Sequence, residues 1–189
     1  DIGIIYLYIA DVYKNQKDYT NAVKYLNEAI NINPRLEIYT KNLTNIAKLI
    51  SIQGDNHLRL NQTNSAIDKY NQAISIDPDL STVLFNISIA YMRNEKFDQA
   101  IIHLSKVVEL EPNRYKAFHK LGYCYQRLGS TSSPGIINED DISIRDKNYL
   151  ESIINFKKSI TVLNYSENKD VKYLSPYHAL GVSFMEMKN

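Results

Sequence analysis

The side chains that could perform acid–base or metal chemistry are few and scattered along the chain. Four histidines occur without the spacing of metal ligands: His57, His103, His119 and His178. The acidic run 139–141 lacks the pattern of a calcium-binding loop, so we interpret it as a solvated loop. No nucleophile motif and no glycine-rich phosphate-binding loop occurs. The sequence therefore predicts no catalytic site, no metal site and no cofactor.

The composition excludes other classes of function. Among 189 residues, 22 Lys and Arg stand against 21 Asp and Glu, and a net charge of +1 removes the electrostatic argument for nucleic-acid binding. No apolar run reaches the roughly 18 residues of a membrane-spanning helix. Cys124 is the single cysteine, and we expect it to be a buried, unreactive thiol. We therefore expect a soluble intracellular protein, in the cytoplasm unless a targeting segment precedes Asp1.

Marker residues recur at a fixed interval, which indicates how the chain is organised. Pro78 and Pro112 lie 34 residues apart, and so do Ala66 and Ala100. Each interval holds two stretches with apolar residues spaced three and four apart, which predicts two amphipathic helices. Proline lacks the backbone donor, so each proline should end the second helix of its pair. One helix pair cannot bury its apolar face alone, so the pairs are expected to stack.

This pattern resembles the tetratricopeptide repeat, in which aromatic-x₂-Leu-Gly-x₂-Tyr is followed by Ala-x₃-Phe and then by Pro. The first segment is present as Phe118, Leu121, Gly122 and Tyr125. The resemblance implies an all-α, right-handed α-solenoid of antiparallel helix pairs, with about four and a half repeats in one domain over 1–189. We place the repeats at 3–36, 47–80, 81–114, 115–166 and, in part, 174–189. Small residues should be buried at the helix contacts: Ala66, Ala73, Ala100 and Gly122.

The spacing of the repeats is interrupted three times. Pro34 and Pro78 are 44 residues apart, and helical spacing continues through 37–46. We therefore expect the first helix of the second unit to be lengthened by nearly three turns at its N-terminus. Residues 130–148 form an insertion in the fourth unit, whose first half has the composition of a loop and should project from the edge of the repeats. Residues 167–173 should form an extended connector.

The resemblance also implies a binding surface, because the first helices of the family's repeats present fixed positions to a concave groove. In the third and fourth units these positions hold Phe85, Asn86, Ile89, Arg93, Lys116, His119, Lys120, Tyr123 and Arg127. The set contains cations and aromatic rings but no carboxylate. Lysine and arginine bind carboxylates, and the rings provide apolar anchors. We therefore predict that this groove binds a protein segment with acidic and apolar side chains.

Some members of the family hold the acidic C-termini of heat-shock chaperones with a two-carboxylate clamp. Asn86, Lys116 and Lys120 fall on three of the five clamp positions. Ser51 and Asp55 fall on the other two, and Asp55 would repel a terminal carboxylate. A carboxylate-clamp co-chaperone is therefore a lesser alternative.

We predict a non-catalytic scaffold or adaptor for protein–protein interaction. The main alternative is a structural subunit packed within a large multiprotein assembly through the lengthened helix and the insertion. A regulatory domain of a larger enzyme is a further alternative. We expect no nucleic-acid partner and no membrane insertion. Both ends of the chain interrupt helix-patterned segments, so we expect it to continue into a longer array.

Overall fold

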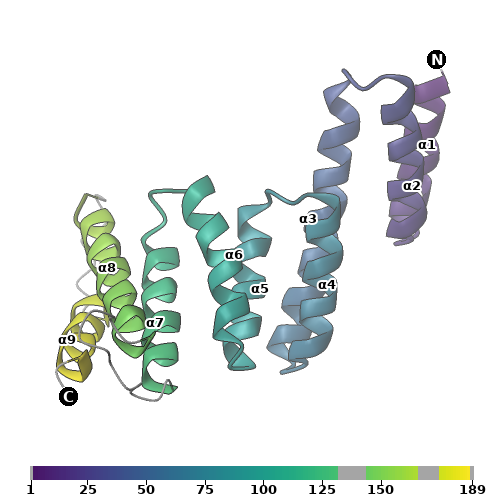
Figure 1. The fold of residues 1–189 in the computed structure, drawn as a ribbon. Helices are drawn as coiled ribbons and strands as arrows, with labels where there is room; N and C mark the ends of the chain where they lie inside the picture. The colour runs from purple at the N-terminus through teal and green to yellow at the C-terminus, as the bar shows by residue number, and fades with distance from the viewer. Residues whose placement is uncertain (1, 132–143, 166–174, 188–189) are drawn as a thin grey trace. The chain divides into compact units, whose positions relative to one another are not determined.

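The computed structural model describes residues 2–131, 144–165 and 175–187, which form α-helices joined by short connections (Figure 1). The helices are α1 (Ile2–Asn15), α2 (Tyr19–Ile32), α3 (Glu37–Arg59), α4 (Thr63–Ile76), α5 (Ser81–Arg93), α6 (Phe97–Leu110), α7 (Tyr115–Thr131), α8 (Ile144–Tyr165) and α9 (Ser175–Met187). No strand occurs in the described residues. The fold is an all-α helical-repeat solenoid, as predicted. In these same ranges no helix is both long and apolar enough to cross a membrane.

The chain divides into two compact units, Asp1–Asn86 and Ile87–Asn189, and the boundary falls within α5. The first, which we call the N-terminal unit, contains α1 to α4 and the start of α5. The second, the C-terminal unit, contains the rest of α5 and α6 to α9.

In the first three helix pairs the second helix, α2, α4 or α6, ends two residues before a proline. The residue between the helix and the proline has left the helical conformation: φ is −140° at Asn33, −134° at Asp77 and −130° at Glu111, with ψ at 85°, 94° and 77°. Proline disfavours the helical conformation of the residue before it, which accounts for this geometry. The N–H of each of these residues still donates to the carbonyl four residues earlier, at 2.8–3.0 Å. The prolines therefore end these helices as predicted.

The turns within the first three helix pairs share one conformation, with a non-glycine residue in the left-handed region. φ is 62° at Lys17, 59° at Asn61 and 57° at Glu95. In each turn the next residue donates its backbone N–H to the carbonyl five residues back, at 2.9 Å, 2.9 Å and 3.0 Å. This hydrogen bond is the signature of a Schellman helix end, which reverses the chain direction. The two helices of each pair are thereby placed against each other.

In the N-terminal unit, α3 contacts both α2 and α4. At 23 residues it is much longer than the 14-residue α2 and α4, which confirms the predicted lengthening. Tyr39 and Ile46 from the added part are buried, and the Thr44 hydroxyl donates to the Asp77 carboxylate at 2.7 Å. The added turns are therefore packed against the rest of the unit rather than exposed.

In the C-terminal unit, α7 and α8 pack closely because α7 carries two buried glycines against aromatic rings of α8. A Cβ on Gly122 would lie 2.7 Å from the Phe156 ring, and one on Gly129 would lie 3.1 Å from the Tyr149 ring. The small residues predicted at helix contacts are all buried: Ala66, Ala73, Ala100 and Gly122. That part of the sequence prediction is confirmed.

The ends of the predicted insertion belong to helices. Residues 130 and 131 complete α7, and 144–148 form the start of α8. The Arg145 guanidinium donates to the Glu186 carbonyl at 3.1 Å, which links the start of α8 to α9. Residues 132–143 and the predicted connector 167–173 lie outside the described residues.

Candidate functional site

An aromatic and cationic cluster forms in the C-terminal unit, where the start of α6 meets α7. The Phe97 and Tyr123 ring centroids are 6.2 Å apart, with the rings edge to face. The Arg127 guanidinium lies 5.3 Å from the Phe97 ring centroid, and its Nη1 donates to the Tyr123 hydroxyl at 3.4 Å. Phe97 is 6% exposed, whereas Tyr123 and Arg127 are half-buried. We call these three residues the Arg127 cluster. A cation held on a ring keeps a defined orientation near the surface.

Two lysines continue this surface along α7. Lys116, Lys120, Tyr123 and Arg127 are spaced four, three and four residues apart, so they share one face of the helix. Lys116 is exposed, with its ammonium group 6.0 Å from the Tyr115 ring centroid, and Lys120 is half-buried. α7 contains no aspartate or glutamate, so none of its own side chains neutralises these charges. We call this surface the α7 basic face.

The remaining predicted groove residues have varied environments. Phe85 is 9% exposed and Asn86 is half-buried, and both belong to the N-terminal unit. In the C-terminal unit Ile89 is half-buried and Arg93 is exposed. The His119 ring packs on the Phe156 ring of α8, with centroids 5.5 Å apart. Burial lowers the pKa of His119, and the nearby Lys120 charge lowers it further. His119 is therefore a neutral packing partner of Phe156. The full groove stays a prediction.

The N-terminal unit contains a polar network around Asp55, on α3. The Tyr70 hydroxyl donates to Asp55 Oδ1 at 2.6 Å, and Asn86 Nδ2 donates to the same oxygen at 2.9 Å. The amide that a carboxylate clamp would use is thus already bonded to a carboxylate of the same unit. Competition from Asp55 for the amide of Asn86 disfavours the clamp.

Phe97 is the residue of the Arg127 cluster that sequence reasoning did not assign to the site. In the repeat pattern Phe97 only marks the start of the second helix of its pair, α6. Its partner Tyr123 comes 26 positions later, in the next repeat. A helical period relates residues within one helix, so it gives no signal for this pairing.

The other candidates for chemistry offer no site. Cys124 is fully buried, and burial raises the pKa of its thiol to about 12, against a smaller opposing effect of the Lys120 charge. In the described ranges, no group of three or more His, Cys, Asp and Glu side chains could hold a metal ion. The acidic run 139–141 lies outside those ranges.

Comparisons with known proteins agree with this repeat structure. Sequence models described as tetratricopeptide repeat match residues 5–36 and 81–114, and one described as TPR repeat matches 54–95. The chain is 27% identical over 145 residues to the "BBSome complex member BBS4 homolog" of Drosophila melanogaster, covering 64% of this chain and 30% of that protein. It is 21% identical over 174 residues to "Anaphase-promoting complex subunit 3" of Schizosaccharomyces pombe, covering 91% of this chain and 24% of that protein. The chain thus spans a third or less of each of these relatives.

A solved structure extends the comparison to the fold. The first tetratricopeptide-repeat domain of Spaghetti (RPAP3), bound to the HSP90 peptide SRMEEVD, superposes with a TM-score of 0.59 at 16% identity. The match covers 76% of this chain and 94% of that domain. Periodic sequence, paired helices with buried small residues, and these matches lead to one assignment: the chain is a tetratricopeptide-repeat protein.

Proposed function

We propose that this chain recruits a partner protein by binding an acidic, partly apolar segment on the α7 basic face. Its repeats make it a protein-interaction scaffold. The main support is the Arg127 cluster. It presents a cation and an aromatic ring beside Lys116 and Lys120, on a helix without carboxylates. Catalysis has no part in this proposal.

The chemistry of the face favours carboxylates as ligand groups. A guanidinium offers five N–H donors in a planar fork, and the bond from Arg127 to Tyr123 uses only one of them. Lys116 and Lys120 add two point charges one turn apart. The half-buried Tyr123 ring supplies an apolar contact next to these charges. A segment that alternates acidic and apolar side chains would pair with the cations and also cover the Tyr123 ring.

The structural neighbour gives an example of such a ligand. The peptide SRMEEVD bound by the Spaghetti domain combines acidic side chains with Met and Val. We propose a ligand of the same chemical kind here, without the clamp for its terminal carboxylate, because Asp55 already bonds the amide of Asn86.

The proposal is tested by reversing the charges of the α7 basic face. Lys116→Glu combined with Lys120→Glu should weaken binding of fluorescein-labelled SRMEEVD by about tenfold or more, measured by anisotropy at low salt. The matched control reverses two exposed lysines elsewhere, Lys24→Glu with Lys147→Glu, and should change binding by less than about threefold. Circular dichroism must show unchanged helix content. Equal losses in both double variants would reject the face as the binding site.

A structural role within an assembly is the second candidate. It is favoured by exposed apolar side chains on α1, namely Ile5, Tyr8 and Val12 at 55–68% exposure, which share one helix face. The names of the two curated relatives describe a complex member and a complex subunit. Sedimentation velocity separates the two roles: a recruiting module should stay monomeric, whereas a structural subunit should self-associate through exposed apolar surface.

A further inference from the structure

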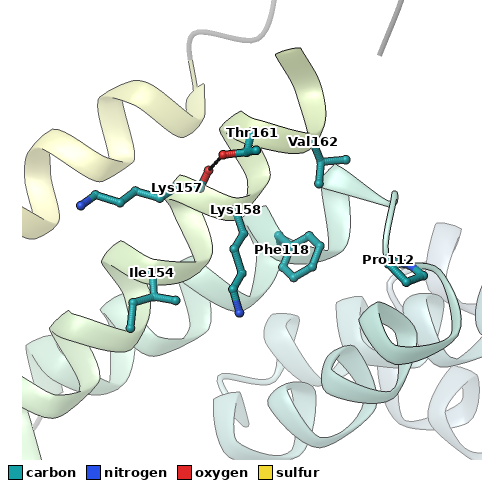
Figure 2. Close-up of a pocket in the computed structure, with 7 residues that line it drawn as sticks. All are labelled: Pro112, Phe118, Ile154, Lys157, Lys158, Thr161 and Val162. Carbon is teal, nitrogen blue, oxygen red and sulfur yellow. Dashed lines mark hydrogen bonds between the residues drawn. The ribbon is translucent and has the colours of Figure 1, made fainter. Parts of the chain in front are cut away.

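A second surface of the C-terminal unit has the chemistry of a docking site. A hollow of about 370 Å³ is bounded by α8, by Phe118 of α7 and by Pro112 before α7. Figure 2 shows the residues that line it. Ile154 and Val162 of α8 complete its apolar lining. The residues of the α7 basic face do not line it. The hollow is therefore distinct from the surface proposed above.

The lining combines apolar groups with positive charge. Lys157 and Lys158 both line the hollow and are exposed, and among the described residues no aspartate or glutamate lines it. The Lys158 ammonium group lies 5.9 Å from the Phe118 ring centroid, and that of Lys157 lies 5.5 Å from the Phe184 ring centroid. Contact with a ring face leaves the N–H donors of an ammonium group available to other acceptors. Neither lysine forms an ion pair with the described residues.

Side chains of α8 extend this surface beyond the hollow. Leu150, Ile154, Lys158 and Thr161 are spaced four, four and three residues apart, so they form one stripe. Leu150 is 42% exposed and Ile154 is 37% exposed, so both side chains are accessible to a partner. From Leu150 to Thr161 the stripe runs about 16 Å at about 1.5 Å per residue. That length matches about three turns of a second helix.

We propose that an acidic amphipathic helix of a partner protein docks along this stripe. Its apolar side chains would cover Ile154 and Phe118, and its carboxylates would bond to Lys157 and Lys158. Charge complementarity selects this occupant, because the described residues of the lining offer cations and no carboxylate. A helix placed in a groove beside another helix is a common mode of peptide recognition. The proposal does not depend on the α7 basic face.

The probe is a fluorescein-labelled synthetic peptide of about four helical turns, with leucines at i, i+4, i+7 and i+11 and glutamates on both flanks. Binding to the full chain is measured by anisotropy at low salt. Lys158→Glu should weaken binding by about tenfold or more. Lys24→Glu is the matched control, because the Lys24 ammonium group also lies 5.9 Å from a ring centroid, that of Tyr25. This control should change binding by less than about twofold. Replacing the leucines of the probe by serine should abolish binding.

Four outcomes would overturn the proposal. Equal weakening by Lys158→Glu and Lys24→Glu would indicate unspecific attraction between charges. Weakening by Lys116→Glu with Lys120→Glu, but not by Lys158→Glu, would place the probe on the α7 basic face. Self-association of the chain that Lys158→Glu abolishes would assign the stripe to a second copy. If Lys158→Glu lost helix content, the folded variant Lys158→Gln would replace it, and undiminished binding by that variant would also reject the proposal.

Discussion

The ring of Phe156 occupies the space that a side chain at Gly122 would need. A Cβ built on Gly122 would lie 2.7 Å from Phe156 Cδ1, and the ring itself is 0% exposed. Gly54 and Tyr70 have the same relationship in the N-terminal unit, also at 2.7 Å. The glycine of the first helix thus sets how closely the second helix can approach.

Gly122→Ala should therefore destabilise the protein. Overpacking costs about 1–3 kcal/mol, which exceeds the roughly 0.5–1 kcal/mol that alanine gains over glycine within a helix. The buried ring of Phe156 has little room to move. We expect Tm to fall by several degrees in thermal unfolding followed by circular dichroism.

Gly181 provides the internal control for that experiment. A Cβ at Gly181 would meet no heavy atom within 4 Å. Gly181→Ala should then show only the helix-propensity gain, about 0.5–1 kcal/mol, and Tm should rise by roughly 1–4 °C. A similar change in Tm for both variants would contradict the role given to Phe156.

Cys124 should be unreactive in the native protein. Burial raises the pKa of its thiol to about 12, so at pH 8 the thiolate fraction is on the order of 10⁻⁴. We expect very slow reaction with Ellman's reagent in buffer. In denaturant one thiol per chain should react at once. Fast stoichiometric reaction of the native protein would show that the helix contact around Cys124 opens readily.

Acidification should destabilise the C-terminal unit through two histidines. Burial lowers the pKa of His103, and burial together with the Lys120 charge lowers that of His119. The unfolded chain then binds more protons than the folded chain once pH falls below about 6.5, so stability decreases as pH falls through that window. We expect a lower Tm at pH 5 than at pH 7.5.

The pH effect should diminish in His119→Gln, which cannot titrate. His178→Gln serves as the control, because the His178 side chain is exposed on α9. A Tm that is equal at both pH values would show that neither histidine couples to folding. A pH dependence that His119→Gln leaves unaltered would show that His119 does not.

Features of the fold could be predicted from the sequence where a residue acts on its own backbone or where the pattern lies within one helix. Pro34 and Pro78 end their helices because the effect is local, and the spacing through 37–46 correctly predicted the length of α3. The left-handed turns were beyond sequence reasoning. Lys17, Asn61 and Glu95 stand where glycine is usual. Asparagine adopts this conformation more readily than most residues, but lysine and glutamate give no signal for it.

The candidate site was predictable as a helix face but not as a set of contacts. The period of α7 places Lys116, Lys120, Tyr123 and Arg127 together. Whether a polar group faces solvent or a neighbour depends on helices distant in sequence. Asp55 was expected to repel a ligand, and the structure shows it accepting hydrogen bonds from Tyr70 and Asn86.

That network leads to a prediction about ligand ends. A carboxylate clamp would hold the free C-terminus by charge-assisted hydrogen bonds worth about 1.5–3 kcal/mol, so amidating the C-terminus of SRMEEVD would weaken binding by at least about tenfold. In this chain Asn86 Nδ2 already donates to Asp55 at 2.9 Å. We expect the free and amidated peptides to differ by less than about threefold. Replacing both glutamates of the peptide by glutamine should weaken binding much more, because the side-chain carboxylates carry recognition. A tenfold loss on amidation, measured by isothermal titration calorimetry, would instead show that a ligand carboxylate displaces Asp55 from Asn86.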